Sequence, residues 1–173
     1  MNFEEKSKNE TFKLKLSQER TLSLKVALTA ITAALYITLG YIFQPISFLG
    51  LQFRVAELIV GMCILFPWEG LVGNVIGVFF VNLSSPLGPI DLISCIVNIP
   101  ALYCIIFLRD KKFLKYLGGV LYSILISIYV AIVLNYAFGL PILLMFVQVL
   151  IAELILAILG IFIFDIIKNR LNL

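Results

Sequence analysis

Apolar segments long enough to cross a lipid bilayer follow one another along almost the whole chain. The first runs from Leu22 past Tyr41, and a helix needs roughly 20 apolar residues to cross a hydrocarbon core of about 30 Å. Charged residues make up only 13% of the 173 residues, against about a quarter in a soluble domain. So little polar surface cannot cover a soluble globule. The sequence therefore predicts an all-α integral membrane protein without a soluble domain.

Turn signals divide these segments into six predicted transmembrane helices that form one bundle. The second and third helices are short and meet in a tight hairpin at Pro67 and Gly70, because proline and glycine interrupt helices. Residues 1–21 are expected to form a charged cytoplasmic segment, and residues 22–173 the membrane domain. The predicted helices are residues 22–43, 55–66, 69–83, 90–108, 117–138 and 141–167.

The distribution of basic residues predicts the orientation of the chain. Twelve of the 13 Lys and Arg residues lie in residues 6–25, in residues 109–115 and in residues 168–170. With six spans all three groups face the cytoplasm, as the positive-inside rule requires, whereas five spans would separate the second group from the third. We therefore expect both termini in the cytoplasm and Arg54 outside the cell.

Several kinds of chemistry lack the residues that they need. The chain has no histidine, and its three cysteines stand singly in apolar runs, so zinc, haem and disulfide sites have no support. It has no phosphate-binding loop and no catalytic constellation, so an enzyme is not expected. No cofactor, metal or nucleic-acid partner is predicted. If the protein is part of a pump, the energy comes from partner subunits.

Acidic residues inside predicted spans are costly, at least about 2.5 kcal/mol each near the bilayer centre, so each needs an explanation. Asp165 precedes Lys168 by one turn, and an interfacial ion pair is its expected role. Glu57 follows Arg54 by three residues, so it can lock the external loop or contact a ligand. Glu153 has no basic neighbour on its own helix, so it can bind a ligand, stay protonated, or pair with a distant residue.

A fourth acidic residue, Asp91, belongs to a polar face of the fourth predicted helix. Asp91, Cys95 and Asn98 recur at i, i+4 and i+7, which places them on one side of that helix. The face can line a binding cleft or make hydrogen bonds between helices. The same alternatives apply to Asn74 and Asn82 on the third helix, where Asn82 is nearer the external end.

Tyrosines form a stripe on the fifth helix, for which helix packing is the expected role and stacking on a planar ligand the alternative. The stripe consists of Tyr122, Tyr129 and Tyr136.

Small residues four apart mark two further surfaces, because they let another helix backbone approach closely. These pairs are Ala30 with Ala34 and Gly73 with Gly77. Packing within the protein and contact with a partner both remain open for them.

Two polar blocks stand out in the apolar sequence. Residues 51–57 read LQFRVAE, and residues 82–88 read NLSSPLG and are followed by Asp91. Together with the alanine-rich first helix and Glu153, these blocks resemble the queuosine-precursor transporter (QueT) family from about Ala27 to the end of the chain. Members of that family are substrate-binding S components of energy-coupling factor (ECF) importers. The chain differs from the usual pattern at Ser94, Cys95 and Ala152, where the family usually has glycine.

The resemblance implies a six-helix S component that captures 7-aminomethyl-7-deazaguanine or a related deazapurine outside the cell. It implies docking on a transmembrane coupling protein that carries two ATPase subunits. In such importers an alanine face of the first helix contacts the coupling protein, which would give Ala30 and Ala34 that role. The S component would then topple in the membrane and carry its ligand inward.

The resemblance also suggests how such a ligand would be bound. A deazaguanine presents two adjacent N–H donors that one carboxylate can accept together, and Glu153 is the predicted partner. Its aminomethyl group is cationic near neutral pH, and Asp91 or Glu57 could supply the second acidic group. Arg54 is expected to hold the external loop as a lid by pairing with Glu57. The remaining polar contacts are assigned to Asn82, Asn98 and Gln52.

Three other functions are compatible with the sequence. The chain could be an S component for another vitamin or small micronutrient. It could be a proton-coupled small-molecule carrier that acts alone, or a structural membrane protein without a ligand.

Overall fold

The structure is a computed structural model that describes the backbone of residues 3–48 and 52–171 and the side chains of residues 21–47 and 52–171. All regular structure in these residues is helical, as predicted, and Leu51 of the LQFRVAE block lies outside them. The elements, including two 3₁₀ helices (η), are α1 (Phe3–Ile42), α2 (Gln44–Phe48), η1 (Val55–Gly61), α3 (Met62–Leu65), α4 (Pro67–Asn82), η2 (Gly88–Ile93), α5 (Ser94–Leu108), α6 (Leu114–Phe138) and α7 (Ile142–Leu171).

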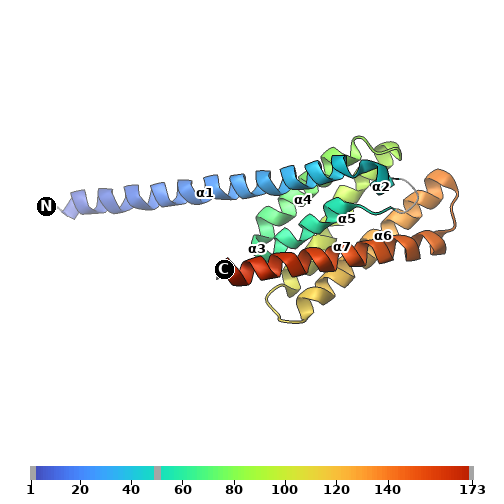
Figure 1. Cartoon of the computed structure of the whole chain (residues 1–173). Helices are drawn as coiled ribbons and strands as arrows, with labels where there is room; N and C mark the ends of the chain where they lie inside the picture. Colours follow the sequence, from blue (N-terminus) through green and yellow to red (C-terminus); the bar gives the residue numbers. More distant parts are fainter. Residues whose placement is uncertain (1–2, 49–51, 172–173) are drawn as a thin grey trace.

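Four helical stretches in the described residues are long and apolar enough to cross a membrane: Thr21–Ile42, Gly88–Leu108, Leu114–Phe138 and Ile142–Leu171. Val55–Leu65 is a shorter apolar helix, and α4 has 16 residues. All six predicted segments are therefore helical, while the number of spans and the orientation remain predictions. The first helix begins at Phe3 rather than near residue 22, and its first half extends beyond the bundle (Figure 1).

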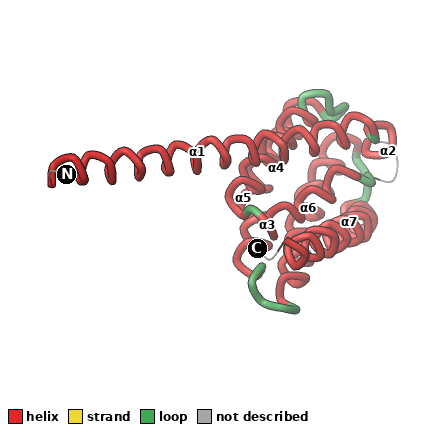
Figure 2. The backbone as a smooth tube through the Cα atoms, turned by 60° about the vertical axis from the view of Figure 1, so that its left-hand side comes forward, coloured by secondary structure: helices red, strands yellow, loops and turns green. Residues whose placement is uncertain are grey.

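The helices form a closed ring around an interior that η1 helps to fill. In order around the ring, α1 packs on α4, α4 on α5, α5 on α6, α6 on α7 and α7 on η1, which contacts α1 again (Figure 2). From α4 to α7 the long helices of the ring follow one another in the order of the chain, whereas η1 and α3, which lie between α1 and α4 in the chain, lie beside α7 in the ring. This insertion places the residues after Arg54 inside the bundle.

The two ends of the bundle contain different elements. The α2 end contains α2, residues 82–90 and the turn between α6 and α7, and the α3 end contains residues 66–67, residues 109–113 and the last turns of α7. The predicted hairpin at the α3 end is confirmed. Phe66 leaves the helical conformation (φ −126°, ψ 87°), and Pro67 begins α4, where its missing N–H costs nothing.

Glycines let the central elements approach closely. A Cβ added to Gly77 would lie 2.6 Å from Cβ of Tyr36, and one added to Gly73 would lie 2.7 Å from the carbonyl oxygen of Thr29. The Gly73 and Gly77 pair is thus the contact surface of α4 for α1, so packing within the protein explains it. Gly61 of η1 and Gly160 of α7 likewise bring their backbones together.

Candidate substrate-binding site

A buried cluster of polar side chains occupies the ring interior, with the Glu57 carboxylate at its centre. Glu57 lies in the first turn of η1 and is 1% exposed. The Tyr36 hydroxyl on α1 donates a 2.6 Å hydrogen bond to its Oε1, and the Tyr122 hydroxyl on α6 donates to its Oε2. Both tyrosine rings are buried in apolar packing. Three elements of the ring are therefore joined through one carboxyl group.

The Tyr122 hydroxyl also links Glu57 to α5. Its oxygen lies 3.1 Å from Oδ1 of Asn98, whose amide nitrogen donates to the Ser94 carbonyl oxygen. One hydroxyl carries one hydrogen, so Tyr122 can satisfy either Glu57 or Asn98 at a time. The cluster therefore has fewer hydrogen-bond donors than acceptors.

Glu153 adds a second buried carboxyl to this interior. It lies in the middle of α7, is 1% exposed, and its Oε2 makes no hydrogen bond. It is close enough to Glu57 and Arg54 to interact electrostatically with both. A buried acceptor without a donor costs roughly 1–3 kcal/mol, so a ligand that supplies N–H or O–H groups here would gain that energy.

Arg54 and Asp91 form a buried ion pair at the α2 end of the cluster. The guanidinium Nη2 lies 3.4 Å from Oδ2 of Asp91, and the two side chains are 8% and 1% exposed. This pair ties the segment before η1 to η2. The acidic partner that the structure gives Arg54 is Asp91, where the sequence suggested Glu57. Asp91 Oδ1 has no hydrogen-bond partner, so half of this carboxylate is available to a donor.

Asn82 and Ser94 shape the backbone that carries Asp91. The Asn82 amide nitrogen donates to the Asp91 carbonyl oxygen at 3.0 Å and to the Ser94 hydroxyl oxygen at 2.6 Å. The Ser94 hydroxyl donates to the same carbonyl oxygen. These bonds hold the junction at which η2 passes into α5, so the nitrogen of Asn82 has a positioning role in this arrangement.

Gln52 lies beside this end of the cluster in an unusual backbone conformation. Its φ of 49° is the one positive φ of a residue other than glycine in the described residues, and such conformations often occur at ligand sites. The side chain is 8% exposed, and its Oε1 has no hydrogen-bond partner. Gln52, two residues before Arg54, therefore has a buried acceptor oxygen that is available to a donor.

The structure brings Glu57, Asn98 and Tyr122 into direct contact and places Glu153 near them, whereas Ala30 and Ala34 are exposed on the outside of α1. Asn74, the other asparagine of α4, donates instead to the carbonyl oxygens of Ile59 and Gly70 and joins α4 to η1.

Two features of the sequence are interpreted differently with the structure known. The tyrosine stripe does not form one surface, because Tyr122 is fully buried, Tyr129 bonds to the Ile90 carbonyl oxygen and Tyr136 is 79% exposed. Tyr36 was not identified from the sequence. Its burial beside Thr32 and Ala33 on one side of α1 is known only from the structure.

The predicted ion pair between Asp165 and Lys168 is wrong. Asp165 pairs with Lys115 on α6 at 2.5 Å, and Lys168 pairs with Asp110 at 3.4 Å. Partners on the neighbouring helix and turn replace the neighbour on the same helix, because the helices converge at the α3 end. The described residues contain no group of His, Cys, Asp and Glu side chains suited to a metal ion.

The cluster can therefore offer acceptor oxygens from carboxyls and amides, together with two tyrosine hydroxyls and one guanidinium. Such a set suits a small polar ligand that is rich in N–H donors.

Among known proteins, a family model described as QueT transporter matches residues 26–169. No curated protein and no solved structure matches the chain.

Proposed function

The chain belongs to the QueT transporter family, and we propose that it is the substrate-binding S component of an ECF importer for a queuosine precursor such as 7-aminomethyl-7-deazaguanine. Family membership makes it a membrane transporter protein. The substrate and the energy-coupling partners are part of the proposal, and the buried carboxyl cluster supports it.

The single observation that best supports this substrate is that an acceptor oxygen of Glu153 lacks a donor. Its Oε2 is buried without a hydrogen-bond partner. The base edge of a deazaguanine presents two adjacent N–H donors, and a carboxylate accepts such a pair in a charge-assisted, bidentate arrangement. Glu153 takes this edge in the proposal, while Asn98 and Gln52 complete the contacts with their available oxygens.

The cationic aminomethyl group requires a second acidic residue. Asp91 has one oxygen without a partner, and Glu57 is a carboxyl that interacts electrostatically with Glu153. Either can accept the ammonium group. The variants Asp91→Asn and Glu57→Gln distinguish them, because the deazapurine-dependent melting shift should be lost in the variant that lacks the true partner. Arg54 acts as the lid residue through its ion pair with Asp91, since it would repel a cation if it contacted one directly.

The proposed topology places six spans in the membrane with both termini in the cytoplasm. Under this topology the α2 end faces the outside, where Arg54, Asp91, Asn82 and Gln52 lie near the entrance. Val55–Leu65 and the 16-residue α4 are short for complete spans, which suits a site between them and longer neighbours. The exposed Ala30 and Ala34 face the coupling protein in this proposal.

The test of the substrate is ligand-dependent melting of the detergent-purified protein. The panel contains 7-aminomethyl-7-deazaguanine, queuine, guanine, riboflavin and thiamine. A ligand at about 100 times its dissociation constant stabilises the protein by about 2.7 kcal/mol, which is a measurable shift. A shift with the deazapurine supports the proposal, and a shift with a vitamin alone would assign a different substrate.

Two variants test the role of Glu153 in the same experiment. Glu153→Gln keeps the shape of the side chain but replaces one acceptor with a donor, so the deazapurine shift should disappear while the protein stays folded. Glu69→Gln makes the same chemical change at the start of α4, at the α3 end, and should leave the shift intact. Loss of the shift in both variants would contradict a specific role for Glu153.

The energy-coupling partners need a separate test. Co-purification with a coupling protein and two ATPase subunits is expected when all are produced together. A proton-coupled carrier acting alone would instead transport substrate into vesicles that contain only this chain, driven by a proton gradient. That result would contradict the proposal that the chain is part of an ECF importer.

A further inference from the structure

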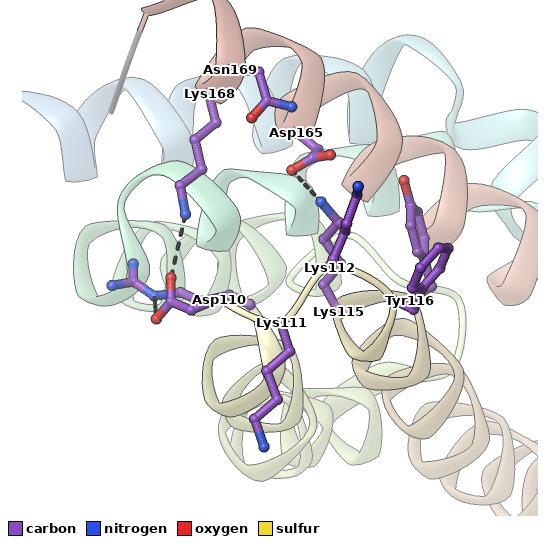
Figure 3. Close-up of a pocket in the computed structure, with 10 residues that line it drawn as sticks. Asp110, Lys111, Lys112, Lys115, Tyr116, Asp165, Lys168 and Asn169 are labelled. Atoms are coloured by element: carbon purple, nitrogen blue, oxygen red, sulfur yellow. Dashed lines mark hydrogen bonds and ion pairs between the residues drawn. The ribbon is translucent and has the colours of Figure 1, made fainter.

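A basic cavity of about 530 Å³ lies at the α3 end, far from the carboxyl cluster. It is formed by the turn between α5 and α6, the first turn of α6 and the last turns of α7 (Figure 3). Five basic residues line it: Arg109, Lys111, Lys112, Lys115 and Lys168. Only two acidic residues, Asp110 and Asp165, accompany them, so the cavity carries an excess of positive charge.

The ion pairs in the cavity leave two of these cations available. Figure 3 shows Lys115 reaching Asp165 and Lys168 reaching Asp110, at 2.5 Å and 3.4 Å. Lys111 and Lys112 are exposed, and neither forms an ion pair within the part of the chain that the structure describes. The ion pairs fix the walls, and the two exposed lysines are free to meet an anion.

An apolar groove of about 490 Å³ adjoins this cavity on the same two helices. Tyr116 lines both, so the groove begins where the basic cavity ends. Its other walls are five aliphatic or aromatic side chains of α7: Leu154, Ile155, Ile158, Leu159 and Phe162. At about 1.5 Å per residue, the groove extends some 12 Å along α7, from Phe162 to Leu154 near the middle of the helix.

We propose that this combined surface is a binding site for one anionic phospholipid, with the phosphate in the basic cavity and an acyl chain in the groove. Positive residues near a membrane surface attract anionic headgroups, and basic cavities between helices bind them specifically. The positive-inside rule accounts for the basic residues of the α5–α6 turn, but it does not account for an apolar groove that continues their cavity. A soluble phosphate would leave that groove empty, so the groove favours a lipid.

The test uses native mass spectrometry of the full-length protein in detergent, titrated with phosphatidylglycerol or with phosphatidylcholine of the same acyl chains. We expect at least a fivefold preference for phosphatidylglycerol. The Lys111→Gln/Lys112→Gln variant should lose most of that preference, and because both side chains are exposed, it should melt like the wild type. The matched control, Lys25→Gln/Arg170→Gln, also removes two positive charges, from residues that do not line the cavity.

Four results would overturn the proposal. Equal binding of the two lipids would remove the role of the basic cavity. An equal loss of the phosphatidylglycerol preference in the control variant would mean that net charge, rather than this cavity, determines the preference. Stabilisation by glycerol phosphate to the same extent as by phosphatidylglycerol would assign the cavity to a soluble phosphate. Ile158→Trp, which fills the groove, supports the lipid if it lowers phosphatidylglycerol binding and contradicts it if binding is unchanged.

Discussion

The hydroxyl of Tyr36 on α1 donates a 2.6 Å hydrogen bond to Oε1 of Glu57 on η1, inside the bundle. The two residues are 21 positions apart, and neither side chain has access to water. This bond joins the first helix, whose outer face is the proposed docking surface, to the carboxyl at the centre of the proposed binding site. The bond is therefore a direct structural connection between the proposed docking face and the proposed binding site.

Replacing Tyr36 by phenylalanine should destabilise the protein, because it removes one of the two donors of a buried carboxyl and leaves an acceptor unsatisfied. The expected loss in free energy of unfolding is about 1–3 kcal/mol, measured by denaturation in detergent. Tyr103→Phe makes the same change on an exposed side chain of α5 and should have no measurable effect. Equal losses in both variants would show that the bond to Glu57 contributes nothing specific.

The Arg54 and Asp91 pair should show strong coupling in a double-mutant cycle. Arg54→Gln and Asp91→Asn each remove one side of this buried ion pair, and each should cost about 3–5 kcal/mol. The double variant should cost clearly less than the sum, because neither charge then remains. The free energies of unfolding of the four proteins provide the measurement. Additive losses would mean that the two side chains do not stabilise one another.

Gly73→Ala should destabilise the contact between α1 and α4. A Cβ at this position would lie 2.5 Å from Cβ of Thr32, so the helices must move apart, at a cost of about 1–3 kcal/mol. Helix propensity alone predicts the opposite effect, an increase of about 0.5–1 kcal/mol in the free energy of unfolding. Gly119→Ala on α6 is the control, because its added Cβ meets only the flexible tip of Ile161.

The melting temperatures of the two glycine variants distinguish these effects. Gly119→Ala should be neutral or stabilising, and Gly73→Ala should melt at a lower temperature than the wild type. A Gly73→Ala protein as stable as the Gly119→Ala protein would refute the role of Gly73 as a contact surface.

Ala30→Trp tests the docking face that we propose on α1. The residue is exposed, so the larger side chain should leave melting and deazapurine binding unchanged. Co-purification with the coupling protein and ATPase subunits should fall at least tenfold, because the tryptophan prevents close approach of another helix. Ala137→Trp, on an exposed position near the end of α6, is the control and should retain the partners.

Part of the proposed site could be found in the sequence because membrane burial penalises charge at any position. Glu57, Asp91 and Glu153 were identified as costly residues in apolar segments, and all three are buried in the interior. Their partners could not be identified in the same way. Asp165 shows why, since its neighbour one turn away was the obvious choice, and a lysine on another helix is its actual partner.

The sequence by itself determined that the protein is all-α and where its apolar helices lie, because apolar segments of sufficient length must satisfy their backbone hydrogen bonds internally in lipid. It did not predict the polar first half of α1 or the short α2. Only the tertiary structure decided which side chains meet. The Tyr122 and Glu57 contact spans 65 residues, and it depends on the rotation and height of η1 and α6 in the ring. Close packing at Gly61 and Gly160 positions η1 on α7, and close packing at Gly118 positions α6 on α5. Such packing is a property of two surfaces in contact rather than of any one segment.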